Sequence, residues 1–237
     1  YVLNGTKCFI TSGKNSGMVI VTAKTDPSAK HKGISAFIVD KGTPGLKIGE
    51  PEDKMGLRAS DTTDLIFEDC KVPVENRLGE EGEGFMMAMT GLDCGRIGIA
   101  AQSVGVAEAA LDAAVDYAKK REQFGQKISK FQGLRFEFAD MATEIEAAKQ
   151  LMFSAAAMKD RGENFTLEAS MAKLFSSEMV NRITAKAIQI HGGYGFIKDY
   201  PVERFYRDAR VFTIYERTSE IQRVVISNHV LNDKRKP

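Results

Sequence analysis

The first third of the chain carries short apolar runs separated by residues that are typical of turns. The runs are rich in Val, Ile, Phe and Thr, which favour extended backbone. One of them, DLIFEDCKV (64–72), partly alternates apolar and polar positions, as a half-buried strand does. Pro and Gly residues mark the breaks. The pattern predicts a small antiparallel sheet or barrel with strands within residues 18–25, 34–41, 45–51 and 62–73.

From Gly82 onward, the apolar positions follow the period of 3.6 residues that is typical of helices. The first helical stretch is crowded with small residues at its middle, which let another helix or a ligand approach closely. The second is amphipathic. Four helices are predicted, over residues 84–120, from 129 or 130 to about 159, from 166 to about 190 and from 219 to about 230, with Thr166 capping the third and a loop following it.

Together these patterns predict an α+β chain. The expected architecture is a partial antiparallel β domain over residues 1–79, followed by an antiparallel four-helix bundle over residues 80–237. At the start of the chain, Val2 and Leu3 precede Asn4-Gly5, which predicts a strand entering a tight hairpin turn. A domain rarely begins on a hairpin with a shortened first strand, so we expect further sequence before Tyr1.

Composition excludes several classes of function. The 237 residues are 43% hydrophobic and 27% charged with a net charge of +1, which leaves no basic excess for nucleic acid or anionic membrane surfaces. No apolar run approaches the roughly 20 residues of a membrane span. The three cysteines are far apart and form no CxxC pair, so we expect no disulfide framework, no metal site and a reducing compartment.

The stretch YERTSEIQR (215–223) carries the first candidate for chemistry. Glu216 follows the apolar stretch VFTIY, where desolvation would raise the pKa of a carboxyl group and suit it to removing a proton. The simpler interpretation is an acidic residue at the start of the last helix, stabilised by the helix dipole. The residues alone favour that simpler interpretation.

Two other motifs could bind phosphate. QIHGGYGF (189–196) offers backbone N–H groups in a glycine-rich loop, and Arg121 in KKREQFG (119–125) could grip a phosphate through two hydrogen bonds. Helix capping explains both more simply, and His191 is more often a packed loop residue than a catalyst. Asp93 and Arg96, one helical turn apart, are interpreted as a surface ion pair worth well under ~1 kcal/mol.

The order of the motifs makes them specific. The chain closely resembles the acyl-CoA dehydrogenase family, nearest its short-chain (butyryl-CoA) members, through NGTKCFITSG, GLDCGRIGIAAQSVGVAEAALDAAVDYAKKREQFG, AIQIHGGYGFIKDYPVERFYRDARVFTIYE and TSEIQR. The resemblance covers essentially all residues. It implies part of the family's middle β domain and the whole C-terminal helical domain, with the N-terminal domain missing. It also implies FAD bound between the subunits of a homo-oligomer, a tetramer or a dimer.

The resemblance implies the reaction as well, which is α,β-dehydrogenation of a short-chain acyl-CoA thioester to trans-2-enoyl-CoA. Glu216 falls on the position of the family's base, which removes the α-proton while the β-hydrogen passes as hydride to flavin N5. In the family, a flavin ribityl hydroxyl and the backbone N–H of the base residue polarise the thioester carbonyl. Some members carry the base in an earlier helix, at the position of Gly95, where glycine cannot serve.

Cofactor and substrate contacts are carried over position by position from the family. Phe9, Ile10 and Thr11 fall where the family places residues against the isoalloxazine, with Phe in place of the commoner Trp. Implied contacts to the rest of FAD are Arg121, Gln123, Phe124, Gln132, Gln189, Ile190, His191, Gly192, Gly193, Thr218, Ser219 and Glu220. Implied substrate contacts are Asp93, Cys94, Gly95, Arg96, Tyr215 and Arg217.

Arg217 departs from the family pattern, which has Gly directly after the glutamate. A cation there could lower the pKa of Glu216, block the thioester, or point to solvent or a CoA phosphate. We therefore hypothesise reduced dehydrogenase activity. The alternatives are an acyl-CoA oxidase and an impaired module that only binds acyl-CoA or FAD or assembles with partners.

Expected partners are the acyl-CoA substrate and electron-transfer flavoprotein, with no nucleic acid and no membrane span. Bacterial cytoplasm and the mitochondrial matrix both fit as compartments. The acyl chain length stays open, because in the family it is set partly by residues of the missing N-terminal domain.

Overall fold

The computed structural model describes residues 1–232. The chain divides into two compact units, residues 1–91 and the residues from Leu92 onward. This division falls inside the long helix α1 (Gly84–Lys120), whereas the boundary at residue 79 was drawn where the helical pattern begins. The two units are described in turn.

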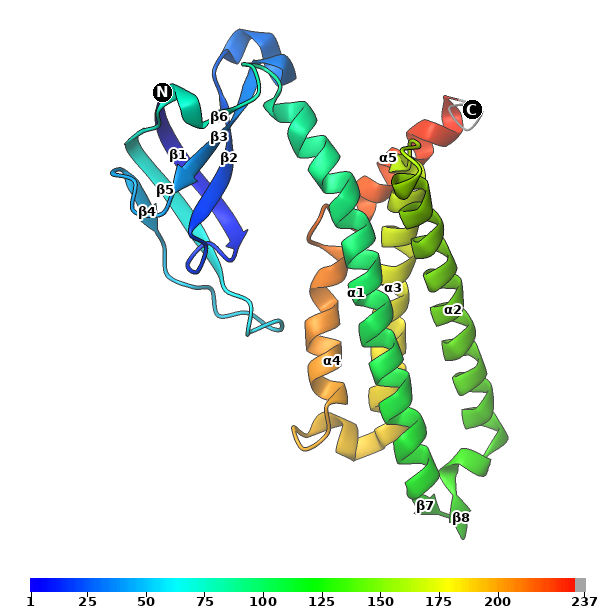
Figure 1. The fold of residues 1–237 in the computed structure, drawn as a ribbon. Coiled ribbons are helices and arrows are strands. Elements are labelled where there is room, and N and C mark those ends of the chain that lie inside the picture. Colours follow the sequence, from blue (N-terminus) through cyan, green and yellow to red (C-terminus); the bar gives the residue numbers. More distant parts are fainter. Residues whose placement is uncertain (233–237) are drawn as a thin grey trace. The chain divides into compact units, whose positions relative to one another are not determined.

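The first unit is built from two antiparallel three-stranded sheets, as the short apolar runs predicted (Figure 1). One sheet has the order β1 (Val2–Thr11), β5 (Thr62–Lys71) and β4 (Leu46–Ile48). The other has the order β2 (Met18–Lys24), β3 (Ile34–Asp40) and β6 (Arg77–Leu78). Buried side chains from these strands, and Val72 just after β5, form one apolar core, whose other members are Leu3, Val21, Phe37, Val39, Leu65, Phe67 and Cys70.

The hairpin predicted at Asn4-Gly5 is wrong. Both residues lie inside β1, which continues to Thr11 along β5, with an irregularity in the register between Leu3 and Gly5. The side chain of Asn4 joins the neighbouring strand instead of closing a turn, since its Oδ1 accepts a hydrogen bond from the backbone N–H of Asp69 at 2.8 Å. A local turn signal is overridden here because the strand finds a partner some sixty residues away in sequence.

The second unit is a helical bundle in which α3 (Thr166–His191) is the most buried helix (Figure 1). It packs against α2 (Gln132–Asp160), α4 (Val202–Ala209) and α5 (Ser219–Leu231). The remaining elements are the short pair β7 (Glu122–Gln123) and β8 (Gln126–Lys127) and the 3-10 turns at 128–130, 192–196 and 210–213. Alanines fill much of the interior, and small side chains bring helix axes close together.

Two local predictions for this bundle are wrong. Thr166 does not cap α3, because it is the first helical residue and the N-cap is Phe165, which makes no side-chain cap. The segment after His191, predicted as a loop, contains α4. Only eight residues long, α4 forms because Val202 and Ala209 are buried on one face while Glu203 and Arg207 pair one turn apart at 2.7 Å.

Helix α1 matches its predicted bounds. It is also long and apolar enough to cross a membrane by length and composition alone, which the inspection of apolar runs had not indicated. The core helix of a soluble protein passes the same test, and Ala100 of α1 packs with Met152 of α2 and Ala172 of α3. The absence of a membrane span therefore stays a prediction.

Candidate active site and cofactor cavity

The Glu216 turn, which we define as residues 214–218, leads from the 3-10 turn at 210–213 into α5. Glu216 has φ 48° and Arg217 has φ 70°, so two consecutive non-glycine residues occupy the left-handed region. That conformation costs an L-residue about 1–2 kcal/mol, and it persists only where the surroundings enforce it. The interpretation of Glu216 as a helix-start acid is wrong, because the N-cap is Thr218 and the acid of the first turn is Glu220.

The carboxylate of Glu216 faces Gly95 of α1. A Cβ atom at Gly95 would lie 2.5 Å from Glu216 Oε2, so any other residue there would force this carboxylate to shift. Oε2 is buried and has no hydrogen-bond partner among residues 1–232. Burial raises the pKa of the Glu216 carboxyl, and the positive charges of Arg96, Lys173 and Arg217 act against that rise. A half-buried carboxylate without a donor is chemically suited to accept a proton.

The predicted surface ion pair between Asp93 and Arg96 is not on the surface. Arg96 is only 4% exposed, and its Nη1 donates to Asp93 Oδ1 and, at 3.3 Å, to Ser170 Oγ. Thr166 Oγ1 donates to the other Asp93 oxygen at 2.8 Å. Burial lowers the pKa of Arg96. The pair therefore belongs to a buried polar network that ties α1 to the start of α3.

Tyr215 and Cys94 lie beside this network. The Tyr215 hydroxyl donates to Gln102 Oε1 of α1, and its ring stacks on Phe212 with centroids 5.7 Å apart. Burial raises the pKa of Tyr215. Cys94 is a half-buried free thiol on α1 between Asp93 and Gly95. All six residues predicted to face substrate thus lie in the helical unit. Four are consecutive on α1 around Gly95, which faces the Glu216 carboxylate, and the other two flank Glu216 in the sequence.

Two residues of this region were not predicted from the sequence as site residues. Lys173 of α3 and Gln222 of α5 are both fully buried, and both donate hydrogen bonds to backbone carbonyls of the Glu216 turn. The signal for Lys173 was its position among small residues, since the positions one helical turn before and after it are Ala169, Ser170, Ser176 and Ser177. Gln222 left no comparable signal.

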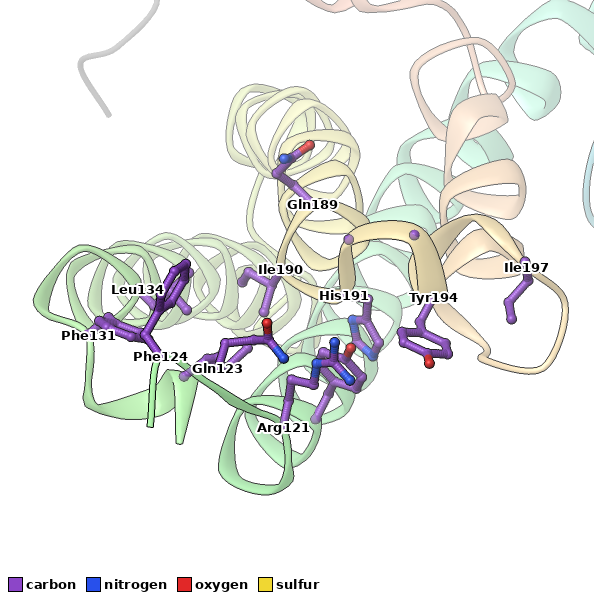
Figure 2. A pocket seen from close by; sticks show the side chains of 14 residues that line it. Arg121, Gln123, Phe124, Phe131, Leu134, Gln189, Ile190, His191, Tyr194 and Ile197 are labelled. Atoms are coloured by element: carbon purple, nitrogen blue, oxygen red, sulfur yellow. The ribbon is translucent and has the colours of Figure 1, made fainter. Parts of the chain in front are cut away.

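A separate cavity of about 640 Å³ lies at the C-terminal ends of α1 and α3 (Figure 2). Helix α5 begins nearer the other end of the bundle (Figure 1). It joins the two motifs that could bind phosphate, which are seventy residues apart in the sequence. The predicted residues that line it are Arg121, Gln123, Phe124, Gln189, Ile190, His191, Gly192 and Gly193. Gln132 is not among its lining residues.

The cavity presents a cation, aromatic rings and open backbone. The Arg121 guanidinium lies over the Tyr194 ring, 5.5 Å from its centroid. Phe124 is 92% exposed with φ 53° and meets Phe131 edge to face. A Cβ at Gly192 or Gly193 would meet no atom within 4 Å, so their backbone is open to a ligand. Such a surface fits a molecule with phosphates and planar rings.

His191 is a packed residue, as its simpler interpretation held. Its ring stacks on Tyr117 with centroids 4.3 Å apart, and its Nδ1 lies 2.8 Å from the carbonyl oxygen of Ala187. Burial lowers the pKa of His191, which favours the neutral ring. We therefore assign His191 to the wall of the cavity and not to proton transfer.

The remaining predicted cofactor residues lie elsewhere. Thr218, Ser219 and Glu220 line a second cavity of about 540 Å³, together with Arg182 and Arg210. The hydroxyl of Ser219 is buried and lacks a hydrogen-bond partner within the described part of the chain. Apart from Gln132, the predicted FAD contacts of the helical unit are therefore divided between two cavities.

In the β unit, Phe9, Ile10 and Thr11 end strand β1. Phe9 is 74% exposed with φ 56°, at a register shift between Lys7 and Ile10. Its backbone N–H donates to Asp64 Oδ1 at 3.2 Å, which holds the distorted strand. Ile10 packs against the core, and Thr11 pairs with Thr62. An exposed ring on a strained strand end is the arrangement expected of a ligand contact.

Two protein-family models match most of this chain. Residues 1–70 match the acyl-CoA dehydrogenase middle domain and residues 82–231 match the acyl-CoA dehydrogenase C-terminal domain. The chain belongs to the acyl-CoA dehydrogenase family, whose cofactor is FAD. The predicted family, fold class and cofactor are thereby confirmed.

Individual relatives are similar over nearly the whole chain. It is 56% identical to "Caffeyl-CoA reductase-Etf complex subunit CarC" of Acetobacterium woodii, over 98% of this chain and 61% of the relative. It is 53% identical to the mitochondrial short-chain specific acyl-CoA dehydrogenase of Rattus norvegicus, over 99% of this chain and 57% of the relative. The solved butyryl-CoA dehydrogenase of Megasphaera elsdenii superposes with a TM-score of 0.96 at 51% identity, covering 98% of this chain and 60% of that one. The chain thus spans about three fifths of the length of the relatives it matches.

Proposed function

We propose that the full-length protein is an FAD-dependent enzyme that removes hydrogen from the α and β carbons of short-chain acyl-CoA thioesters. The observation that carries this proposal is the half-buried carboxylate of Glu216, which lies against Gly95 and whose Oε2 has no hydrogen-bond partner among residues 1–232. In a family whose reaction begins with loss of an α-proton, this group is the candidate base.

The residues around Glu216 support a role in proton transfer. Glu216 would take the α-proton, and its own backbone N–H would donate to the thioester oxygen, where negative charge develops. Arg96 and Lys173 place positive charge near this point, which stabilises a developing anion in a half-buried site. Tyr215, held by Gln102, would form part of the substrate wall.

FAD, when bound, accepts the β-hydrogen as hydride. In the helical unit, Arg121 would hold its pyrophosphate, with Gly192 and Gly193 offering backbone N–H groups and Phe124 a stacking surface. In the β unit, the exposed ring of Phe9 would lie against the isoalloxazine, with Ile10 and Thr11 beside it. Thr218, Ser219 and Glu220 would complete the site on the side of the base.

The same residues serve the reaction in either direction, because a base that removes the α-proton returns it in the reverse reaction. This matters because the chain resembles both a dehydrogenase and a reductase subunit of an Etf complex. We propose electron-transfer flavoprotein as the redox partner, a homotetramer or homodimer as the assembly, and bacterial cytoplasm or the mitochondrial matrix as the compartment. An oxidase would instead consume oxygen when substrate is added, which an oxygen electrode measures.

The second candidate function is that of a family member with impaired catalysis, and Arg217 is the residue that favours it. Its φ of 70° is one that glycine adopts freely and arginine does not, and its charge acts against the raised pKa of Glu216. A weaker base with a bulky neighbour would still leave the cofactor cavity intact. The impaired protein would therefore bind FAD and acyl-CoA without turning substrate over.

The visible spectrum of the bound flavin separates these candidates. Butyryl-CoA is added anaerobically to the full-length protein and to its Glu216→Gln variant. The dehydrogenase predicts bleaching of the oxidised flavin band, with the variant slower by roughly 10²- to 10⁴-fold because its base is gone. A bound flavin that stays oxidised with butyryl-CoA and with longer and branched acyl-CoA thioesters would support the impaired member, and bleaching at equal rates in both proteins would remove Glu216 as the base.

A further inference from the structure

Lys173 is a charged residue in a place where charge is expensive. It lies in the first third of α3, its side chain is 0% exposed, and its ammonium makes one hydrogen bond among residues 1–232, to the backbone oxygen of Arg217 at 2.8 Å. Burial lowers the pKa of Lys173 to about 8. A buried ammonium that meets no carboxylate directly destabilises a fold, so a purely structural role would be served better by an apolar side chain.

Gln222 holds the same turn from the other side. It is fully buried on α5, and its side-chain amide donates to the backbone oxygens of Glu216 at 3.2 Å and of Arg217 at 3.4 Å. Its Oε1 has no hydrogen-bond partner within the described residues. Two buried side chains from two helices therefore converge on two consecutive carbonyl groups, and those carbonyls belong to the two residues in the left-handed conformation.

We propose that Lys173 is a positioning residue for Glu216, which it orients by clamping the backbone carbonyl of Arg217 jointly with Gln222. This inference rests on the proposed function of Glu216 as the base. A left-handed pair of non-glycine residues relaxes unless something holds it. With both carbonyls held, the backbone directs the Glu216 carboxylate toward Gly95 and fixes the direction of the Glu216 N–H, on which polarisation of the thioester depends.

The charge on Lys173 adds to this role. The negative charges of Glu178, Glu216 and Glu220 stabilise its ammonium, while Arg96 opposes it. The ammonium is thus part of the electrostatic surroundings of Glu216 as well as a donor to the turn. A neutral donor of the same length would hold the carbonyl without this contribution.

The test compares Lys173→Met with Lys186→Met in the full-length protein with FAD bound. Both lysines lie on α3, but Lys186 is partly exposed and pairs with Glu137 at 2.6 Å, so its variant controls for loss of a lysine from this helix. We expect Lys173→Met to lower kcat roughly 100-fold, the cost of a misplaced catalytic group, with KM changed less than about threefold. Its Tm should not fall below that of Lys186→Met, since methionine is accommodated in an apolar interior. An unchanged kcat, or a loss that only follows a lowered Tm, would overturn the inference.

Backbone hydrogen exchange provides a readout that needs no turnover. In Lys173→Met, exchange should speed up within residues 213–219 while the rest of α3 and α5 stays protected, and Gln222→Leu should produce the same local change more weakly. Unchanged exchange at 213–219 would overturn the clamp whatever the enzyme assays give. If the unmodified protein neither reduces flavin nor exchanges the α-proton of butyryl-CoA with solvent deuterium, the proposed function fails, while the exchange result still decides whether Lys173 holds the turn.

Discussion

The helical unit contains two kinds of site, and they are built on opposite principles. The Glu216 turn is half-buried, charged and strained, and side chains from α1, α3 and α5 hold it. The cavity at Arg121 is open, lined by aromatic rings and glycine, and made by two chain segments at helix ends. The first arrangement suits a reacting group that must be oriented within a fraction of an ångström, and the second suits a large ligand that brings its own shape.

Gly95→Ala should disturb the Glu216 turn most while leaving the cavity untouched. The added methyl group would lie 2.5 Å from the Glu216 carboxylate and displace it. We expect turnover of butyryl-CoA to fall roughly 100-fold, with flavin content unchanged. The control is Gly98→Ala on the same helix, where a Cβ meets no atom within 4 Å. Equal turnover in the two variants would mean that Gly95 does not shape the site.

Arg121→Met tests the cavity without touching the Glu216 turn. Losing a cation from a phosphate contact should weaken FAD retention roughly tenfold, measured by flavin release on dilution. The rate of α-proton exchange in protein that still holds FAD should be unchanged. Lys119→Met is the matched control, because Lys119 is an exposed cation in the last turn of α1, two residues before Arg121, and does not line the cavity. A loss of proton exchange in Arg121→Met would show that the two sites are not independent.

Substitution of Arg217 should sharpen the comparison with a smaller effect. Arg217→Gly relieves a left-handed arginine and should raise the free energy of unfolding by about 0.5–1 kcal/mol, measured by urea denaturation. It should also raise turnover severalfold, because a cation that lowers the basicity of Glu216 is removed. Arg217→Ala keeps the strained Cβ and removes the charge, so it should raise turnover without the gain in stability. Unchanged turnover in both variants would contradict the hypothesis that Arg217 restrains this enzyme.

The pH dependence of stability should carry the smallest signal. Burial raises the pKa of Glu216, so the folded state holds this proton more tightly than the unfolded chain does. The contribution of Glu216 to stability is therefore full below its unfolded pKa and is lost as pH rises through the higher folded pKa. Glu216→Gln should raise the Tm at pH 7, and the difference should shrink as pH falls toward 4. A difference that stays constant with pH would indicate that Glu216 is not desolvated in solution.

Features that depend on residues close together in the sequence could be predicted from the sequence. The bounds of α1 and the positions of β2, β3, β4 and β5 followed from the pattern of apolar residues, because burial of one face imposes a period of 3.6 or 2 on the chain. Arg121 and the glycines at 192 and 193 were candidates for a phosphate site by residue type, but the residues alone favoured helix capping. Their proximity was implied only by the family resemblance, since the two motifs follow the C-terminal ends of two separate helices, α1 and α3.

What the sequence by itself determined about this protein is its class, its family and the identity of Glu216 as the candidate base. Only the tertiary structure decided that Asn4-Gly5 lies within a strand, that Asp93 and Arg96 are buried, and that Lys173 and Gln222 hold the Glu216 turn. The reason is physical. Hydrophobic period and turn chemistry are properties of neighbouring residues, whereas burial of a charge and partners for a strained backbone depend on segments that meet only after the chain has folded.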